Sequence, residues 1–179
     1  MQEWNVVVTV SEQGFRRAEE LLSSLGVVKR TDFFNVFLIF VEDIQSMLET
    51  LTEWSVQRPQ DFALISRVVP ATRTFTFQSS EVFKERAREI VLGWLGGLAG
   101  RSFHVRMHRR GFKEKLSSQE EERFMDDVLA DALEKAGTPG RISFTDPDVI
   151  IAVETVGPWA GLSLWTRDDI ERYPFLKLD

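Results

Sequence analysis

The chain has 179 residues, of which 43% are hydrophobic and 28% charged, and its formal net charge is −6. These values are typical of globular proteins, and the length allows one large core or two small ones. The longest apolar run, residues 36–41, is far shorter than the roughly 20 residues of a transmembrane helix. The first residues also lack the basic and apolar regions of a signal peptide. We therefore expect a cytoplasmic protein with no membrane partner.

Cysteine is absent from the sequence. Its absence excludes disulfides, thiolate-bound zinc, iron–sulfur clusters and cysteine nucleophiles. His104 and His108 are the only imidazoles, and no third ligand has a spacing typical of a metal site. We therefore expect no metal and no cofactor.

The charges are unevenly distributed along the chain. Residues 67–115 contain eleven Lys or Arg and four Glu, a net of +7, whereas the rest of the chain has a net of −13. A basic stripe on an acidic body attracts phosphates locally and disfavours indiscriminate binding. The negative total is therefore compatible with a nucleic-acid partner.

Residues 1–69 predict a domain with six elements in the order βαββαβ. Strands follow from period-two apolar patterns and helices from apolar stripes. Asp32 is placed in a tight turn between two strands, and Pro59 prevents the second helix from continuing. The predicted elements are 3–10, 11–25, 27–31, 33–41, 42–54 and 62–69. This order is typical of a ferredoxin-like unit.

Residues 70–179 predict a second, α/β domain, so the expected fold class is α+β. Its first helix begins at Ser79 or Ser80, and its second begins with a capping box formed by Ser118 and Glu121. The extended segments and strands are expected at 72–77, 102–109, 141–144, 149–155 and 160–165. The glycines between Gly93 and Gly100 end a helix and match no nucleotide-binding loop.

The strand at 102–109 and the loop after it carry the strongest chemical signal. Residues 101–115 contain six Lys or Arg, two His and one Glu. Gly111 lets the backbone approach a phosphate closely, and the following helix start offers free amide groups to an anion. We expect a phosphate-binding cradle here, with Arg73 as a second contact. The expected RNA contacts are Arg73, Arg101, His104, Arg106, His108, Arg109, Arg110, Gly111, Lys113, Lys115, Ser117 and Ser118.

Structural interpretations remain open for these residues. A run of charges also forms ordinary solvated surface, and the two histidines are compatible with polar strand positions. Phe75, Phe77 and Phe112 are candidates either for stacking on unpaired bases or for packing in a core.

Acidic residues allow similar alternatives. Asp146, Asp148 and Glu154 are compatible with a magnesium site, although Asp-Pro-Asp is also a common turn. We expect Asp126, Asp127 and Asp131 to form the solvated face of their helix.

The segment from Phe103 to Glu120, followed by 147–154 (PDVIIAVE), resembles the THUMP domain, and most closely the stand-alone THUMP proteins that act as adaptors in tRNA cytidine acetylation. The likeness spans about residues 70–166. The unit before it is similar to the ferredoxin-like unit that accompanies THUMP domains. The resemblance implies binding of the tRNA acceptor stem and 3′ end, through Arg106, Arg109, Arg110, Lys113 and the helix start at Ser117 and Ser118.

The resemblance also bears on catalysis. Enzymes of this family append thiouridine synthetase, methyltransferase, deaminase or pseudouridine synthase domains, and we expect none in this chain. The first hypothesis is therefore a non-enzymatic tRNA-binding adaptor that delivers tRNA to a separate modifying enzyme. The alternative is a protein-interaction module that uses acidic surfaces and aromatics such as Trp159, without RNA binding. A metal-dependent hydrolase using Asp146, Asp148 and Glu154 is a third.

Overall fold

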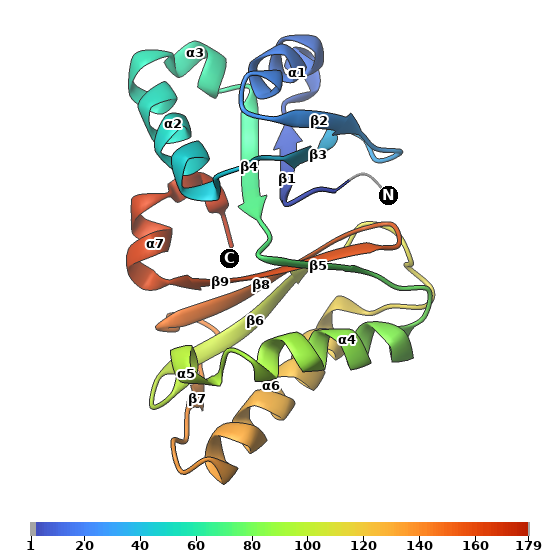
Figure 1. Ribbon diagram of the computed structural model, residues 1–179, viewed down its shortest axis with the longest axis vertical. Helices are drawn as coiled ribbons and strands as arrows, with labels where there is room; N and C mark the ends of the chain where they lie inside the picture. Colours follow the sequence, from blue (N-terminus) through green and yellow to red (C-terminus); the bar gives the residue numbers. More distant parts are fainter. Residues whose placement is uncertain (1–2, 179) are drawn as a thin grey trace. The chain divides into compact units, whose positions relative to one another are not determined.

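The computed structural model describes residues 3–178, which form two compact units (Figure 1). The first unit contains the residues up to Ala71 together with Arg172–Lys177, and the second contains Thr72–Glu171 and Leu178. The range 70–179 expected for the second domain included the C-terminal segment. The structure assigns Arg172–Lys177 to the first unit, because the Tyr173 hydroxyl donates to Glu49 at 2.7 Å. Within residues 3–178, no helix has the length and apolar character needed to cross a membrane.

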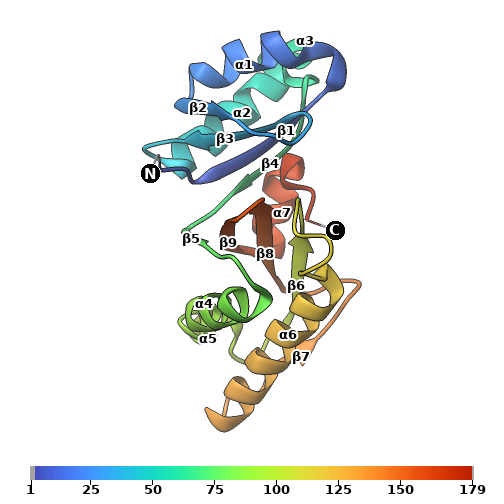
Figure 2. The ribbon, with the colours of Figure 1, turned by 90° about the vertical axis from the view of Figure 1, so that its right-hand side faces the viewer.

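A four-stranded antiparallel sheet in the order β2-β3-β1-β4 forms the first unit. This order and the βαββαβ succession confirm the ferredoxin-like arrangement. Helices α1, α2 and α3 lie on one side of the sheet (Figure 2). The elements are β1 (Val6–Val10), α1 (Phe15–Ser23), β2 (Val27–Arg30), β3 (Val36–Phe40), α2 (Ile44–Gln57), α3 (Pro59–Phe62) and β4 (Ile65–Pro70), with 3-10 turns at Glu12–Gly14 and Pro174–Leu176.

The turn between β2 and β3 is longer than predicted. The strand expected from residue 33 begins at Val36, because the Thr31 hydroxyl accepts the N–H of Phe33 and donates to the carbonyl of Val36. Asn35 completes the turn with a φ of 58°. The strand expected from residue 62 was also wrong at its start. Pro59 occupies the first position of a short helix, where its fixed φ is favourable, and β4 begins only at Ile65.

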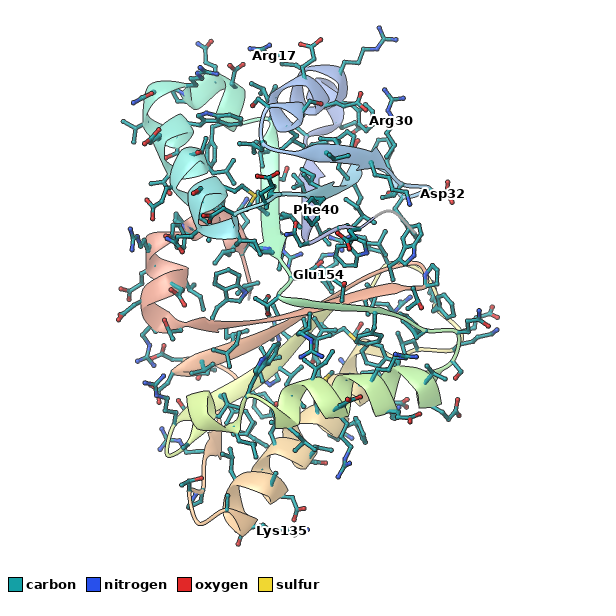
Figure 3. The ribbon with its side chains drawn as sticks, viewed as in Figure 1. Arg17, Arg30, Asp32, Phe40, Lys135 and Glu154 are labelled. Atoms are coloured by element: carbon teal, nitrogen blue, oxygen red, sulfur yellow. The ribbon has the colours of Figure 1, made fainter. Side chains whose placement is uncertain are left out.

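The second unit is built on a mixed sheet in the order β5-β9-β8-β6-β7. Strand β6 runs parallel to β7 and β8, whereas β9 is antiparallel to β8 and β5. Helices α4, α5 and α6 lie along the same side of this sheet (Figures 1 and 2). The elements are β5 (Arg73–Thr76), α4 (Ser80–Leu92), α5 (Leu95–Leu98), β6 (Ser102–His108), α6 (Ser118–Lys135), β7 (Arg141–Ile142), β8 (Val149–Val156), β9 (Trp159–Thr166) and α7 (Arg167–Arg172). Lys135 marks the end of α6 (Figure 3).

One core joins the sheet of the second unit to its helices. The alternation predicted for β6 places Phe103 and Val105 in this core, where they are 0% exposed and share the cluster with Phe83 of α4 and Leu129 of α6. Burial of such side chains contributes about 1.5–3 kcal/mol each. The core therefore holds β6 rigidly beneath the loop that follows it.

The two long helices of this unit are joined by an ion pair between a buried glutamate and a half-buried lysine. Glu121 is 0% exposed, and its Oε1 accepts from the Lys84 ammonium at 2.6 Å and from the Ser80 hydroxyl at 2.9 Å. The predicted cap at Ser118 was wrong. The residue that caps α6 is Ser117, whose hydroxyl accepts the N–H of Glu120 at 3.4 Å, since Glu121 is used to bind α4.

Candidate functional site

Two carboxylates of α6 fix the position of the β6 edge. Asp126 accepts the backbone N–H of Val105 at 2.9 Å, and Glu122 accepts that of Met107 at 2.8 Å. Residues four apart on a helix share a face, and residues two apart on a strand direct their N–H groups to the same side. The short strand β7 pairs only with the start of β6. Helix α6 therefore provides hydrogen-bond acceptors for the backbone N–H groups of β6 that lie beyond the reach of β7.

His104 lies inside this arrangement. It is 4% exposed, and its Nδ1 is 2.8 Å from Oδ2 of Asp126. The expectation that Asp126 belongs to a solvated helix face was therefore wrong, because Asp126 is 3% exposed; its neighbours Asp127 and Asp131 are exposed as predicted. Of the two predicted histidine contacts, the structure buries His104 and leaves His108 exposed.

The loop after β6 is tied to the hairpin formed by β8 and β9. The Arg110 guanidinium donates to Glu154 at 2.7 Å, and the two side chains are only 8% and 2% exposed. Glu154 projects from β8 (Figure 3). The Arg110 backbone also donates to Thr155, and its carbonyl accepts from Gly157. Arg110, expected as an RNA contact, is thus positioned to hold the loop in place.

An unusual backbone conformation shapes the next part of the loop. Gly111 has a φ of 89°, as its predicted freedom allows, and Phe112 has a φ of 52°. The Phe112 ring packs 5.1 Å from that of Phe77, which is 2% exposed. Phe75 and Phe77 both pack against Phe83. The core interpretation therefore holds for these aromatics, and Phe112 serves as an anchor of the loop.

Four cations remain at the surface where β6 meets α6. We call them the β6–α6 cations: Arg106, Arg109, Lys113 and Lys115. The two lysines are exposed and the two arginines half-buried. Arg109 donates to the Gly111 carbonyl. Among residues 3–178, no carboxylate forms an ion pair with any of the four, so their charges are available to an anion.

The N-terminus of α6 is adjacent to these cations. Ser117 uses its hydroxyl for the cap, Ser118 is half-buried, and the first turn carries Glu120 and Glu121. Carboxylates in the first turn already complement the helix dipole. The contribution of this helix start to anion binding is therefore smaller than the sequence suggested.

Two predicted contacts lie away from the β6–α6 cations. Arg101 precedes the start of β6, and Arg109 follows its end. Since a strand rises by about 3.3 Å per residue, the two arginines are more than roughly 20 Å apart. Arg73 is on the edge strand β5. It pairs with Leu162, which pairs with Val153, which in turn pairs with Met107, so Arg73 and Met107 are three strand spacings, or roughly 14 Å, apart. The structure leaves both arginines exposed but does not bring them to the loop.

The carboxylates of the alternative metal site are widely separated. Asp148 and Glu154 stand at opposite ends of β8, roughly 20 Å apart. Arg167 lies 3.2 Å from both Asp146 and Asp148. Asp148 also accepts the Ser102 backbone N–H, and this hydrogen bond, followed by that from the Ser102 hydroxyl, lowers the pKa of Asp148 below 3.8. These groups join β6, β8 and α7 instead of converging on one ion.

The sequence analysis missed an open groove beside β6. Its lining includes Arg106, Arg123, Phe144 and Gln119, and its volume is about 540 Å³. Phe144 is 71% exposed. Arg123 lies on α6 and Phe144 in the loop after β7, so no periodic pattern in the sequence joins them.

Comparison with known proteins gives structural matches only. No family model and no curated protein sequence matches the chain. TrmN from Thermus thermophilus is 19% identical, with a TM-score of 0.58 over 90% of this chain and 45% of its own. A 4-thiouridine synthetase in complex with RNA and bound ATP is 18% identical, with a TM-score of 0.53 over 92% and 42%. PH1313 from Pyrococcus horikoshii Ot3 is 14% identical, with a TM-score of 0.59 over 92% and 55%.

These matches establish the fold. The chain spans about half the length of the solved structures that it matches. Its fold is THUMP-like, in agreement with the resemblance seen in the sequence.

Proposed function

We propose that this chain binds tRNA through the β6–α6 cations and presents it to a separate modifying enzyme. The observation that carries the proposal is the cluster Arg106, Arg109, Lys113 and Lys115, with no carboxylate partner within residues 3–178, on a fold shared with a synthetase solved with RNA. Phosphate contacts from Lys and Arg provide most of the affinity of proteins for nucleic acids.

The rigidity of the loop supports this role. Arg110 and Phe112 anchor the loop through Glu154 and Phe77, so the backbone that carries the flanking cations Arg109 and Lys113 is held in place. A pre-ordered surface loses less conformational entropy on binding than a flexible one. The arrangement is suited to recognising the shape of an RNA backbone, which requires several phosphates to be contacted at once.

The adaptor role and the absence of catalysis are part of the same proposal. They are supported by the lack of cysteine and by the two buried pairs, Arg110 with Glu154 and His104 with Asp126, which use titratable groups for structure. We propose that the modification is performed by a partner enzyme in the cytoplasm.

A tRNA-binding assay tests the RNA half of the proposal. The variant Arg106→Ala/Lys113→Ala/Lys115→Ala removes three surface cations and preserves Arg110, whose loss would disturb the fold. The matched control, Arg16→Ala/Lys135→Ala/Arg141→Ala, removes three exposed cations elsewhere. In gel-shift titrations at low salt, we expect the wild type and the control to bind tRNA and the first variant to bind at least tenfold more weakly. Equal binding by all three would show that the surface is wrong.

Affinity purification tests the adaptor half. We expect a tRNA-modifying enzyme to copurify with the tagged chain, and part of this association to disappear after nuclease treatment. A partner retained after nuclease treatment, together with no tRNA binding by the pure chain, would favour the protein-interaction module instead.

A further inference from the structure

A small pocket in the first unit contains none of the residues that we assign to tRNA binding. Its volume is about 230 Å³, whereas pockets for drug-sized ligands have roughly 300–1,000 Å³. Residues of α2, α3, β4 and the C-terminal segment Arg172–Lys177 line it, and all of them belong to the first unit. The pocket is therefore suited to a ligand smaller than a typical drug molecule.

The body of this pocket is apolar. Phe62 and Phe175 line it, with their ring centroids 6.0 Å apart and their planes at 75°. Ile65 adds a buried aliphatic side chain to the same lining. A ring or a branched aliphatic group bound beside these side chains is removed from water, which favours binding.

The C-terminal segment that forms one wall of the pocket is fastened at both ends. At its start, the Tyr173 hydroxyl donates to Glu49 at 2.7 Å, and at its end the Lys177 carbonyl accepts from Nε of Arg67 at 3.0 Å. The Phe175 ring lies between these attachments and packs 5.9 Å from the ring of Tyr173. The pocket is therefore preformed, so a ligand that enters it loses little affinity to the ordering of the protein.

The charged groups at the pocket have a single sign. Both charged lining residues are cations, Arg172 and Lys177, and no carboxylate of residues 3–178 lines the pocket. Arg172 is paired with Glu49 at 2.7 Å. Lys177 is exposed and has no ion-pair partner in the described part of the chain. The pocket therefore favours an anionic ligand over a neutral or cationic one.

Hydroxyl groups complete the polar part of the lining. The Thr52 hydroxyl donates to the carbonyl of Leu48, and the Ser55 hydroxyl donates to the carbonyl of Thr52, so these two oxygens are left as acceptors. The half-buried Ser66 hydroxyl has no hydrogen-bond acceptor within residues 3–178. Ser66 and Lys177 thus supply two donors to one pocket, which match the two oxygens of a carboxylate.

We propose that this pocket binds a small carboxylate with a compact apolar body. The body contacts Phe62 and Phe175, and the carboxylate accepts from Ser66 and Lys177. One unpaired cation matches the single charge of a carboxylate better than the double charge of a phosphate monoester. The inference goes beyond the proposed tRNA binding and does not depend on it.

Titration of the isotope-labelled chain with phenylacetate, followed by the NMR shifts of its backbone amides, tests the proposal. At an ordinary ligand efficiency, a ligand of about ten heavy atoms binds in the millimolar range. We expect saturable shifts at Ser66 and Phe175. Phenylacetamide has the same body without the charge, and benzylamine has the opposite charge. Both should bind at least about threefold more weakly than phenylacetate, as expected for the loss of one exposed charge pair.

Two variants locate the anion. Lys177→Gln removes the unpaired cation and should weaken phenylacetate at least about threefold while leaving phenylacetamide unchanged. Ser66→Ala should weaken phenylacetate in the same direction. The matched control is Lys135→Gln, since Lys135 is an exposed lysine at the end of α6, and it should bind both compounds like the wild type.

The remaining outcomes overturn the proposal. These are no saturable shifts in the wild type, equal affinities for phenylacetate and phenylacetamide, or unchanged phenylacetate binding by Lys177→Gln. A short peptide ending in phenylalanine is a further probe. If its free-acid form binds more tightly than phenylacetate and its amidated form does not, the pocket is a site for a protein C-terminus and not for a small acid. Failure of tRNA binding would leave this inference intact, because the two tests alter different residues.

Discussion

The guanidinium of Arg110 lies 2.7 Å from the carboxylate of Glu154, with 8% and 2% of the two side chains exposed. The pair joins the loop after β6 to the strand β8, two segments that are 44 residues apart in the chain. Breaking a buried ion pair is costly because the remaining charge loses its partner in a medium of low polarity. This geometry gives Arg110 a different role from the surface cations beside it.

Arg110→Ala is expected to lower the free energy of unfolding by about 3–5 kcal/mol, because it leaves the buried Glu154 carboxylate without this partner. Lys113→Ala, three residues further along, should change it by less than about 0.5 kcal/mol. Urea denaturation followed by circular dichroism provides the comparison. Similar stabilities of the two variants would show that Arg110 is an ordinary surface residue.

Asp126→Ala is expected to destabilise the chain by about 3 kcal/mol, since it removes the acceptor of the Val105 N–H and the partner of the His104 ring, both buried. The adjacent Asp127 is exposed and serves as the control, with an expected change below about 0.5 kcal/mol for Asp127→Ala. Hydrogen exchange of the Val105 amide gives a local readout. Unchanged protection of this amide in Asp126→Ala would contradict the assignment.

The Asp148 carboxylate should make stability depend on pH. Its pKa is lowered in the folded state, first by the backbone N–H of Ser102 and then by the Ser102 hydroxyl. A group with a depressed folded pKa contributes stability above its unfolded value, and this contribution is lost as the pH falls through the folded pKa. Asp148→Asn should therefore be less stable than the wild type at pH 7, and the difference should shrink below about pH 4. A difference that stays constant from pH 7 to pH 2.5 would count against this linkage.

Two glycines provide a matched test of the packing. A Cβ at Gly26 would lie 2.1 Å from the carbonyl oxygen of Phe40, whereas a Cβ at Gly96 would meet nothing within 4 Å. Gly26→Ala should cost about 1–3 kcal/mol or more, because backbone must move. Gly96→Ala in the short helix α5 should be neutral or stabilising by up to about 1 kcal/mol. Thermal unfolding should show a lower Tm for Gly26→Ala and an unchanged or higher Tm for Gly96→Ala, and equal shifts of the two variants would contradict the packing.

The fold was largely predictable from the sequence, because apolar periodicity is local. The period-two apolar pattern around Val8 predicts the first strand, and the alternation of Phe103 and Val105 predicts the buried face of β6. Both patterns lie within a few neighbouring residues. The ends of elements were less predictable. The Thr31 hydroxyl bonds that delay β3 and the Glu121–Lys84 pair that moves the cap to Ser117 depend on partners that sequence spacing does not reveal.

The candidate site was only partly predictable for the same reason. Charge counting located the segment that carries the exposed lysines Lys113 and Lys115, but it treated all cations of the segment alike. Arg110 and His104 are distinguished from Lys113 only by Glu154 and Asp126, which are 44 and 22 residues away. Which charges face solvent is decided by such long-range pairs.

The salt dependence of tRNA affinity tests the central claim most directly. Removing a cation that neutralises one phosphate should reduce the slope of log K against log[salt] by about 0.9. Fluorescence titrations from about 50 to about 300 mM salt should therefore give Arg106→Ala/Lys113→Ala/Lys115→Ala a slope smaller than that of the wild type by about 2–3. The control Arg16→Ala/Lys135→Ala/Arg141→Ala should keep the wild-type slope. If the two triple variants have the same slope, the β6–α6 cations do not bind the tRNA backbone.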